Sequence, residues 1–381
     1  MKQITILNPS QLVFGDGAYR TFIDEFLKRK EKRLFIVADN AVVNQIREGT
    51  NKLKASGVKF YLDSSVKNEP DFELFNEIVA RAREFKADAV AGIGGGSVLD
   101  VAKLVAAFVD NDQNIYEAVG IGNLSGRSVY LACLPTTSGT GSEVSPNAIL
   151  LDRENDLKKG IVSPHLVPDS TYIDPQFTHT VPPNVTAATG LDALTHCIEA
   201  YTNVHAHPMI DIYALEGIKL ISSNLKRAID NGDDTEARAK LSLGSLYGGL
   251  CLGPVNTTAV HALSYPLGGM FHIAHGISNA LLLPHVMEFN MVKAPERFAE
   301  VGLALGAEAG STPMDTAENG VSIIRKLMRN CDIPTKLSEL NVPENSIEKM
   351  ADGALQVTRL LKNNVREVTY EDALNIYQKA Y

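Results

Sequence analysis

The sequence predicts an α/β domain followed by an all-helical domain. In the first 181 residues, short apolar runs alternate with amphipathic helical segments, a spacing typical of a parallel, Rossmann-like sheet with helices on both faces. After Thr180–Pro183 the pattern is almost wholly helical, with Gly and Pro between segments. The chain has 381 residues, more than a single hydrophobic core usually serves. We therefore expect two domains, residues 1–181 and 182–381.

Each predicted element follows from a local pattern. Short apolar runs predict strands at Leu34–Asp39, Val58–Asp63, Asp88–Ile93, Ser128–Leu134, Asn147–Leu151 and Ser170–Ile173. Apolar residues at helical spacing predict helices at Ala41–Ala55, Phe72–Phe85 and Ser97–Val109, the last with Ser97 as its N-cap. In the second half the clearest helices are Asn184–Tyr201, Pro208–Ile229, Thr235–Leu250 and Pro295–Leu305.

Composition excludes several classes of protein. The formal net charge is -9 without clusters of one sign, which disfavours nucleic acid or anionic lipid as a partner. No apolar run approaches the roughly 18 residues of a membrane helix, and Met1–Gly17 lacks a signal-peptide core. Four scattered cysteines fit buried thiols in a reducing compartment. We expect a cytoplasmic protein.

Three consecutive glycines, Gly94–Gly96, follow a predicted strand and precede a predicted helix that begins with Ser97. Glycines let backbone N–H groups point inward, and a helix N-terminus attracts anions. The loop therefore suits the pyrophosphate of a dinucleotide, although it lacks the G-x-G-x-x-G spacing. A tight turn between strand and helix is the alternative reason for the glycines.

Two other polar features follow predicted strands. Asp39 ends the first predicted strand, where a carboxylate could accept hydrogen bonds from the ribose hydroxyls of NAD and repel a 2′-phosphate. A helix cap is an equally good interpretation of Asp39. The loop Pro135–Glu143, which includes Thr136 and Thr137, could line the same crevice or be an ordinary loop.

Histidines and one aspartate favour a metal site in the helical half. Asp192 and His196 are four residues apart in a predicted helix, so they lie on one face, one turn apart. His261, His272 and His275 follow within a short segment. Imidazoles with one carboxylate suit Fe(II) or Zn(II), not Mg or Ca. The residues alone leave a metal site and buried structural histidines about equally open.

Taken together, these motifs resemble the iron-dependent (group III) alcohol dehydrogenase family. The resemblance runs through nearly the whole chain and rests on several motifs in the correct order: Phe14-Gly15, Gly94–Ser97 with Asp100 and Lys103, Pro135–Glu143, Gly190–His196, His261–Gly276 and Asn363–Tyr381. It implies a dinucleotide-binding α/β domain, a helical domain that carries the metal, and a homodimer or larger homo-oligomer.

The resemblance also implies site residues. The implied metal ligands are Asp192, His196, His261 and His275. The implied cofactor-binding residues are Asp39, Gly95, Gly96, Ser97, Asp100, Thr136, Thr137 and Lys158. One departure concerns substrate: many members carry a histidine four residues after the third ligand, where this chain has Tyr265. Tyr265 can still hydrogen-bond a substrate or pass a proton, and His272 is either a substitute proton relay or a packing residue.

The predicted function is therefore metal-dependent, NAD-linked interconversion of a small alcohol and its carbonyl compound. Fe(II) is the expected metal, with Zn(II) as the other candidate, and Asp39 favours NAD over NADP. A lyase or cyclase of the dehydroquinate-synthase type is the main alternative. It is disfavoured because few Lys or Arg residues lie near the proposed ligands in the sequence. A non-catalytic nucleotide-binding protein would have no use for the Asp and His set.

Overall fold

The computed structural model describes residues 2–67, 69–154 and 157–381. The chain divides into two compact units. What we call the α/β unit comprises Ile6–Thr137 and Gly141–Val181, and the helical unit comprises Met1–Thr5, Ser138–Thr140 and Pro182–Tyr381. The main boundary between the units thus falls between Val181 and Pro182. Ser138–Thr140, from the polar loop, belong to the helical unit.

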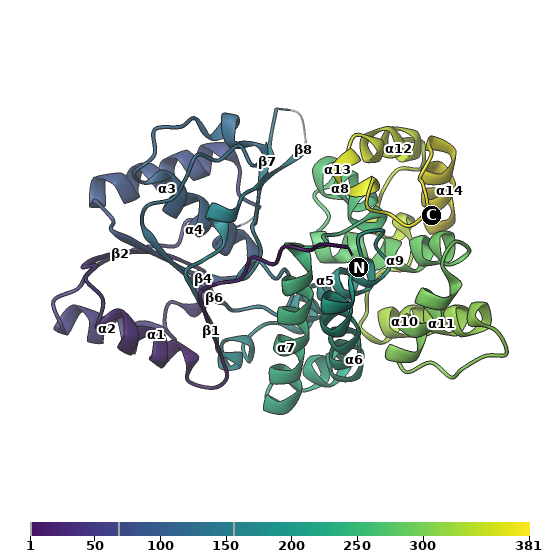
Figure 1. Cartoon of the computed structure of the whole chain (residues 1–381), viewed down its shortest axis with the longest axis horizontal. Helices are drawn as coiled ribbons and strands as arrows, with labels where there is room; N and C mark the ends of the chain where they lie inside the picture. The colour runs from purple at the N-terminus through teal and green to yellow at the C-terminus, as the bar shows by residue number, and fades with distance from the viewer. Residues whose placement is uncertain (1, 68, 155–156) are drawn as a thin grey trace. The chain divides into compact units, whose positions relative to one another are not determined.

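A six-stranded parallel sheet forms the centre of the α/β unit, which confirms the predicted fold class (Figure 1). Its strands, in spatial order, are β1 (Gln11–Phe14), β9 (Ser170–Ile173), β6 (Tyr130–Pro135), β4 (Ala89–Gly94), β2 (Arg33–Ala38) and β3 (Lys59–Asp63). The helices of the unit are α1 (Ala18–Phe26), α2 (Arg47–Ala55), α3 (Phe72–Phe85) and α4 (Gly96–Phe108).

Helices cover both faces of this sheet, as Figure 1 shows for α1 and α2 on one face and α3 and α4 on the other. Strand β2 shows why: successive side chains point to opposite faces, and after Arg33 all of them are apolar. Leu34 and Ile36 join the core that includes α1, whereas Phe35 and Val37 join the core that includes α3 and α4. A continuous apolar run is therefore the correct signal for a strand buried on both faces.

The strand order reverses between β2 and β4. The chain passes from β2 outward to β3 and then returns to β4 on the other side of β2. In open parallel sheets, ligands bind at the carboxyl ends of the strands where such a reversal opens a crevice. The fold therefore marks the ends of β2 and β4, followed by Asp39 and Gly95, as the ligand-binding edge.

Three parts of the α/β unit differ from the predictions. Asn147–Asp152 is a strand, β7, but it pairs antiparallel with β8 (Leu157–Val162) in a separate small sheet completed by β5 (Gly120–Ile121). Strands β1 and β8 and helix α1 were not among the predicted elements. The predicted helix over 41–55 is interrupted: a 3₁₀ turn at Asn40–Val42 precedes α2.

The prediction that Ser97 caps helix α4 is wrong. The N-cap is Gly95, whose extended backbone carbonyl accepts the N–H groups of Val98 and Leu99. Ser97 lies inside the first turn and is partly exposed. Glycine is required at the preceding position, because a Cβ on Gly94 would lie 2.6 Å from Cβ of Val98 in the first turn of the helix. The loop between β4 and α4 is thereby reduced to a single residue.

The helical unit consists of α5 (Pro183–Tyr201), α6 (Pro208–Asp230), α7 (Thr235–Leu252), α8 (Ala259–Phe271), α9 (His275–Met291), α10 (Pro295–Ala304), α11 (Pro313–Asn330), α12 (Ile347–Leu355), α13 (Thr358–Leu361) and α14 (Tyr370–Ala380). Helix α5 is its centre, packed against α6, α7 and α9. The four helices predicted here end within two residues of those observed. Among the described residues, no helix is long and apolar enough to cross a bilayer.

Candidate metal centre and cofactor edge

Helix α5 supplies the first pair of candidate ligands. Asp192 and His196 are one helical turn apart and both are buried. Oδ1 of Asp192 lies 3.8 Å from Nε2 of His196. The spacing of four residues therefore does bring the two side chains together, as the sequence pattern predicts.

Helices α8 and α9 bring two further histidines to the same carboxylate. Nε2 of His261 and Nε2 of His275 each lie 3.7 Å from Oδ1 of Asp192. Gly276 allows this approach, because a Cβ at that position would lie 2.1 Å from the carbonyl oxygen of Ala188 on α5. A larger residue would push the start of α9, and His275 with it, away from α5.

The four predicted metal residues are thus neighbours, but they are not equivalent. One ligand atom from each of Asp192, His261 and His275 lies within 4.8 Å of the others. His196 stands beside this group: its ring stacks on that of His261 with a centroid distance of 4.8 Å. The arrangement is a convergent set of three donors with a fourth next to it.

The protonation states suit a cation. Burial alone would raise the pKa of Asp192, but His196, His275, His261 and the amide of Asn279 outweigh it and hold the pKa below its ordinary value. Burial lowers the pKa of His196. An ionised carboxylate beside a neutral imidazole is the form in which these groups bind metals.

Asn279 is a member of this cluster that the sequence analysis missed. Its Nδ2 donates to Oδ1 of Asp192 at 2.7 Å and lies 3.1 Å from Nε2 of His261 and 3.2 Å from Nε2 of His275. Its Oδ1 is buried and has no hydrogen-bond partner among the described residues. The signal was available, because Asn279 follows His275 by four residues and so shares its face of α9.

Glu199 is a second missed residue, and it acts behind the cluster. One carboxylate oxygen accepts hydrogen bonds from the Thr258 hydroxyl and the Val260 N–H, each at 2.7 Å. The other oxygen is bonded to Nδ1 of His261. A carboxylate on Nδ1 places the proton there and leaves Nε2 free as a ligand atom. Glu199 therefore fixes the His261 ring in its ligating tautomer.

The two residues predicted for substrate or proton transfer have different surroundings. Tyr265 is partly buried, its ring centroid lies 6.2 Å from that of His275, and its hydroxyl accepts a 2.9 Å hydrogen bond from Arg359. His272 is exposed and ends α8 in a left-handed conformation, with φ of 54°. In the described part of the chain, no hydrogen bond or ring contact joins His272 to the candidate ligands. Tyr265 is thus the better placed of the two.

In the α/β unit, the predicted cofactor residues gather at the carboxyl ends of neighbouring strands. The N–H of Asp39 donates to the carbonyl of Ile93, and the N–H of Thr136 donates to that of Gly94, both at 3.0 Å. A Cβ on Gly95 would lie 3.5 Å from Thr137, so the two face each other. The N–H groups of Gly96 and Ser97 belong to the first turn of α4, where a helix has no internal acceptor for them.

The carboxylate of Asp39 caps the following 3₁₀ turn by accepting the N–H of Ala41 at 2.9 Å. Two other predicted cofactor residues are held in ion pairs. Asp100 accepts from the Ser142 hydroxyl at 2.5 Å and lies 3.3 Å from the buried ammonium of Lys103. Lys158 pairs with Glu69. Asp100 and Lys158 therefore brace the small sheet and the loop that leads to it.

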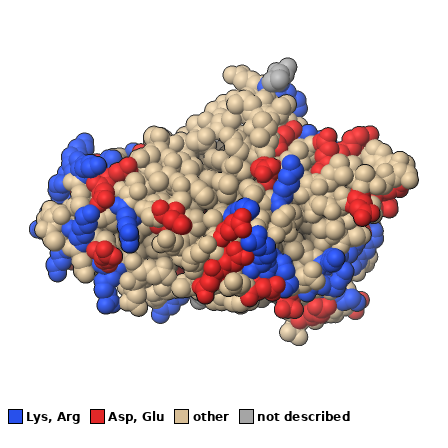
Figure 2. Space-filling view, turned by 90° about the horizontal axis from the view of Figure 1, so that it is seen from below, with Lys and Arg blue, Asp and Glu red and all other residues tan. Residues whose placement is uncertain are grey.

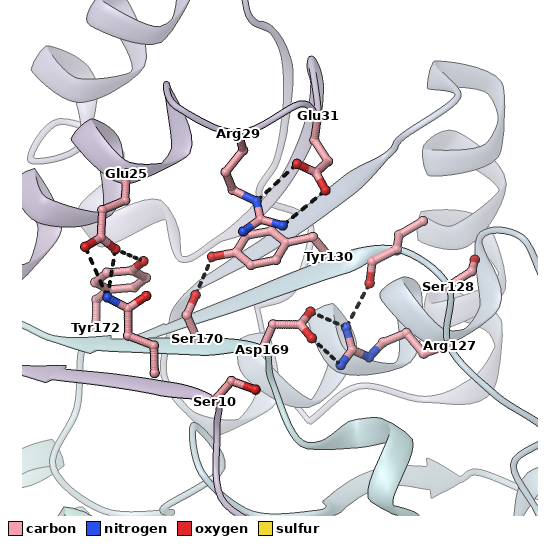
Figure 3. A pocket seen from close by; sticks show the side chains of 12 residues that line it. Ser10, Glu25, Arg29, Glu31, Arg127, Ser128, Tyr130, Asp169, Ser170 and Tyr172 are labelled. Atoms are coloured by element: carbon pink, nitrogen blue, oxygen red, sulfur yellow. Dashed lines mark hydrogen bonds and ion pairs between the residues drawn. The ribbon is translucent and has the colours of Figure 1, made fainter.

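A polar pocket of about 810 Å³ lies at the opposite edge of the same sheet, at the amino ends of β6 and β9 (Figure 3). Its charged groups are already paired: Arg29 with Glu31 and Arg127 with Asp169. Glu25 accepts a hydrogen bond from the Tyr172 hydroxyl at 2.5 Å. Each charged side chain described in the pocket lining is thus held by an ion pair or, for Glu25, by neutral hydrogen-bond donors, and we do not assign the pocket to the reaction.

The surface charge is mixed in sign. On the face drawn in Figure 2, acidic and basic side chains occur close together over much of the surface. That distribution agrees with a net charge of -9 spread over the chain. The expectation that nucleic acid is not a partner stays a prediction.

Comparison with known proteins identifies the family. Residues 9–175 match the iron-containing alcohol dehydrogenase model, and residues 186–381 match the C-terminal model of the Fe-containing alcohol dehydrogenase family. A long-chain-alcohol dehydrogenase of Geobacillus thermodenitrificans is 36% identical over 388 aligned positions, covering 100% of this chain and 98% of the relative. The chain belongs to the iron-containing alcohol dehydrogenase family.

Solved structures agree with that family. An alcohol dehydrogenase from Oenococcus oeni has a TM-score of 0.95 and 31% identity, with 100% of both chains covered. A sulfoacetaldehyde reductase from Bifidobacterium kashiwanohense, solved in complex with NAD⁺, has a TM-score of 0.89 and 26% identity over 100% of this chain and 99% of the other. By class this chain is an NAD-linked alcohol dehydrogenase, an oxidoreductase that interconverts an alcohol and its carbonyl compound.

Proposed function

We propose that the helical unit holds a ferrous ion, with Zn(II) as the other candidate, through Asp192, His196, His261 and His275. Three acceptor atoms converge on the single amide group of Asn279, and the buried Oδ1 of that amide lacks a partner among the described residues. A cation at this point would satisfy acceptors that one amide satisfies poorly. One carboxylate with three imidazoles is a donor set that suits Fe(II) or Zn(II).

The α/β unit, in this proposal, binds NAD at the carboxyl ends of β2, β4 and β6. Gly95, Gly96 and Ser97 offer backbone N–H groups and the start of α4 to the pyrophosphate, and Thr136 and Thr137 line the same edge. Asp39 faces the ribose, where its carboxylate favours NAD over NADP. Asp100 and Lys158 keep a supporting role, because their charges are already used within the unit.

The chemistry follows from these two sites. When bound, the metal supplies Lewis acidity at the substrate oxygen and the nicotinamide ring takes up or releases the hydride. The Tyr265 ring lies beside that of His275, and its hydroxyl can hydrogen-bond a bound substrate. Glu199 keeps Nε2 of His261 unprotonated, and burial of Asp192, His196 and His261 excludes water from the cluster.

The convergence of Asp192, His261 and His275 is the observation that carries this proposal. The test is to purify the chain, measure its bound metals, and follow NADH formation with a panel of small alcohols and NADH loss with the matching aldehydes. The assay is run on protein as isolated and after anaerobic addition of Fe(II) or Zn(II), with NADP as the competing cofactor.

We expect metal-dependent turnover that prefers NAD. Bound metal and tight NAD binding without NADH formation or loss across the panel would instead favour an untested substrate or the lyase or cyclase alternative. Protein that binds neither metal nor NAD would contradict the proposal.

Two further features of the protein are part of the proposal. The four cysteines are all free and buried in the described structure, which supports a reducing, cytoplasmic location. A homodimer or larger homo-oligomer is expected from the family resemblance. Light scattering of the purified protein measures the oligomeric state directly.

A further inference from the structure

Arg359 is a cation held close to the candidate metal centre. It lies on α13, which packs against α8 (Figure 1). Its Nη2 donates to the Tyr265 hydroxyl at 2.9 Å, and its guanidinium carbon lies 6.0 Å from the centroid of the Tyr265 ring. The side chain is therefore partly buried and fixed against an aromatic ring instead of extending freely into solvent.

Tyr265 connects this arginine to the candidate ligands. It follows His261 by four residues, so the two share a face of α8. The Tyr265 ring is also a neighbour of His275, with 6.2 Å between ring centroids. A small molecule that reaches the ligand cluster past Tyr265 would meet the guanidinium of Arg359 at its other end.

Arg359 also differs from other arginines of the helical unit. Arg297 pairs with Asp211, Arg325 with Glu288, and Arg227 with Asp234 and Glu236. None of the described carboxylates pairs with Arg359. A guanidinium carries five N–H donors in a planar fork, so a single bond to a phenol leaves most of its donors available to a ligand.

We propose that Arg359 and Tyr265 bind the anionic group, a carboxylate or sulfonate, of a short substrate whose opposite end carries the reacting carbonyl or hydroxyl. A guanidinium fork matches two oxygens of such a group. The Tyr265 hydroxyl accepts from Arg359 and keeps its own hydrogen for a second bond to the anion. This inference rests on the proposed function and names its substrate class.

The reaction itself does not change. The carbonyl carbon gains a hydride from NADH, which becomes NAD⁺, the carbonyl oxygen gains a proton from solvent, and the anionic group at the far end stays as it was. A neutral aldehyde of the same length can react in the same way. It would leave the partly buried guanidinium with its bond to Tyr265 but no anionic partner, and this is the source of the expected preference.

The kinetic test compares matched substrates. Succinic semialdehyde is paired with butanal, and sulfoacetaldehyde with propanal, and the quantity measured is the ratio of kcat/KM for the anionic member to that for the neutral member. We expect the wild type to favour the anionic members. Arg359→Met should lower the ratio about 10- to 100-fold, the range for a hydrogen bond to a charged group.

Three further variants sharpen this test. Arg359→Lys keeps the charge without the fork and should fall between wild type and Arg359→Met. Tyr265→Phe should lower the ratio less than Arg359→Met, because it removes one hydrogen bond and no charge. Arg329→Met removes an exposed positive charge at the end of α11 and should leave the ratio unchanged. A wild type that prefers the neutral members, or a ratio that Arg359→Met does not change, would overturn the inference.

A binding measurement separates this inference from the proposed function. Calorimetry gives the dissociation constants of propanesulfonate and of the neutral propanesulfonamide for the metal-loaded protein. Propanesulfonate should bind more tightly to the wild type than to Arg359→Met, and the amide equally to both. Arg359-dependent binding of the anion without any turnover would support the anion site and contradict the proposed reaction. Turnover of neutral aldehydes, together with equal propanesulfonate binding by wild type and Arg359→Met, would support the proposed reaction and contradict the anion site.

Discussion

The candidate sites of the two units are formed by different kinds of groups, backbone in one and side chains in the other. At the edge of the α/β unit, the groups available to a ligand are mainly backbone N–H groups of Gly96 and Ser97 at the start of α4. The helical unit instead collects side chains from α5, α8 and α9 around the carboxylate of Asp192. The first site depends on how strands and helices are joined, and the second on which residues the helices carry.

This difference determines what each unit tolerates. A site made of backbone is sensitive to any Cβ that disturbs the junction of strand and helix, but side chains nearby can serve the fold. Asp100 and Lys158 do so through their ion pairs. A site made of side chains depends on each donor and on the groups that orient it, such as Glu199.

The largest expected effect concerns stability of the α/β unit at high pH. Burial raises the pKa of Glu143 from its ordinary 4.5 to about 7, against the smaller opposing effects of the Glu143 backbone and Lys103. The folded chain thus keeps a proton that the unfolded chain releases. The stability from this group is complete below pH 4.5 and is lost as pH rises through 7.

Glu143→Gln should remove that loss, which corresponds to about 3 kcal/mol. Urea unfolding between pH 4 and 9 gives the free energy of unfolding of both proteins. The difference between variant and wild type should shift in favour of the variant on going from pH 4 to above pH 7. Glu84→Gln, an exposed residue of α3, is the control. Parallel pH profiles for wild type and Glu143→Gln would contradict the prediction.

The helical unit should respond to pH in the opposite direction. Burial lowers the pKa of His285 from 6.5 to about 4, assisted by Arg325 and Lys379 and opposed by Glu288. The stability from the neutral imidazole is therefore present above pH 6.5 and is lost as pH falls through 4. We expect His285→Gln to reduce the acid-side loss by at most about 3 kcal/mol in the same unfolding experiment, since the His285 side chain is only partly buried. If wild type and His285→Gln lost the same unfolding free energy at acid pH, His285 would not be a buried neutral imidazole.

A test of the side-chain site is Glu199→Gln. A glutamine amide can donate to Nδ1 of His261, which would move the ring proton to Nε2 and remove a ligand atom. Metal affinity, measured by competition with a chelator, should fall about tenfold or more. Glu216→Gln on the exposed face of α6 should bind metal as wild type does. Equal metal affinity of Glu199→Gln and wild type would contradict an orienting role for Glu199.

The smallest expected effect tests the backbone site. A Cβ at Gly94 would lie 2.6 Å from Cβ of Val98, at the junction of β4 and α4, whereas a Cβ at Gly126 meets nothing within 4 Å. Gly94→Ala should cost at least about 1 kcal/mol of unfolding free energy and weaken NAD binding, while Gly126→Ala should do neither. If Gly94→Ala bound NAD as tightly as wild type, the junction would not be part of the cofactor edge.

Much of the helical site was predictable because residues four apart in a helix lie on the same face, one turn apart. Asp192 and His196, four residues apart, are neighbours in the structure. Asn279 follows the same rule from His275 and could have been found by it. Arg359 could not, since it lies 94 residues beyond its partner Tyr265 and no local pattern links the two.

The α/β unit was predictable in its fold class and central strands and less so in its side chains. The apolar runs identify the central strands, since each is buried on both faces. Lys158 illustrates the limit: the family resemblance implied a cofactor contact there, and no local pattern indicated its partner Glu69, which lies 89 residues away. Ser97 illustrates another limit, because the glycine before it, not its hydroxyl, starts the helix.

The central claim is that the Asp and His cluster binds the metal on which dehydrogenation depends. The most direct test measures bound iron and NADH formation for wild type, His261→Ala and His205→Ala, where His205 is an exposed histidine of the helical unit. We predict that His261→Ala loses both the metal and turnover by more than about 100-fold, beyond the effect of an orienting residue, while His205→Ala matches wild type. Full metal content and full activity in His261→Ala would contradict the account.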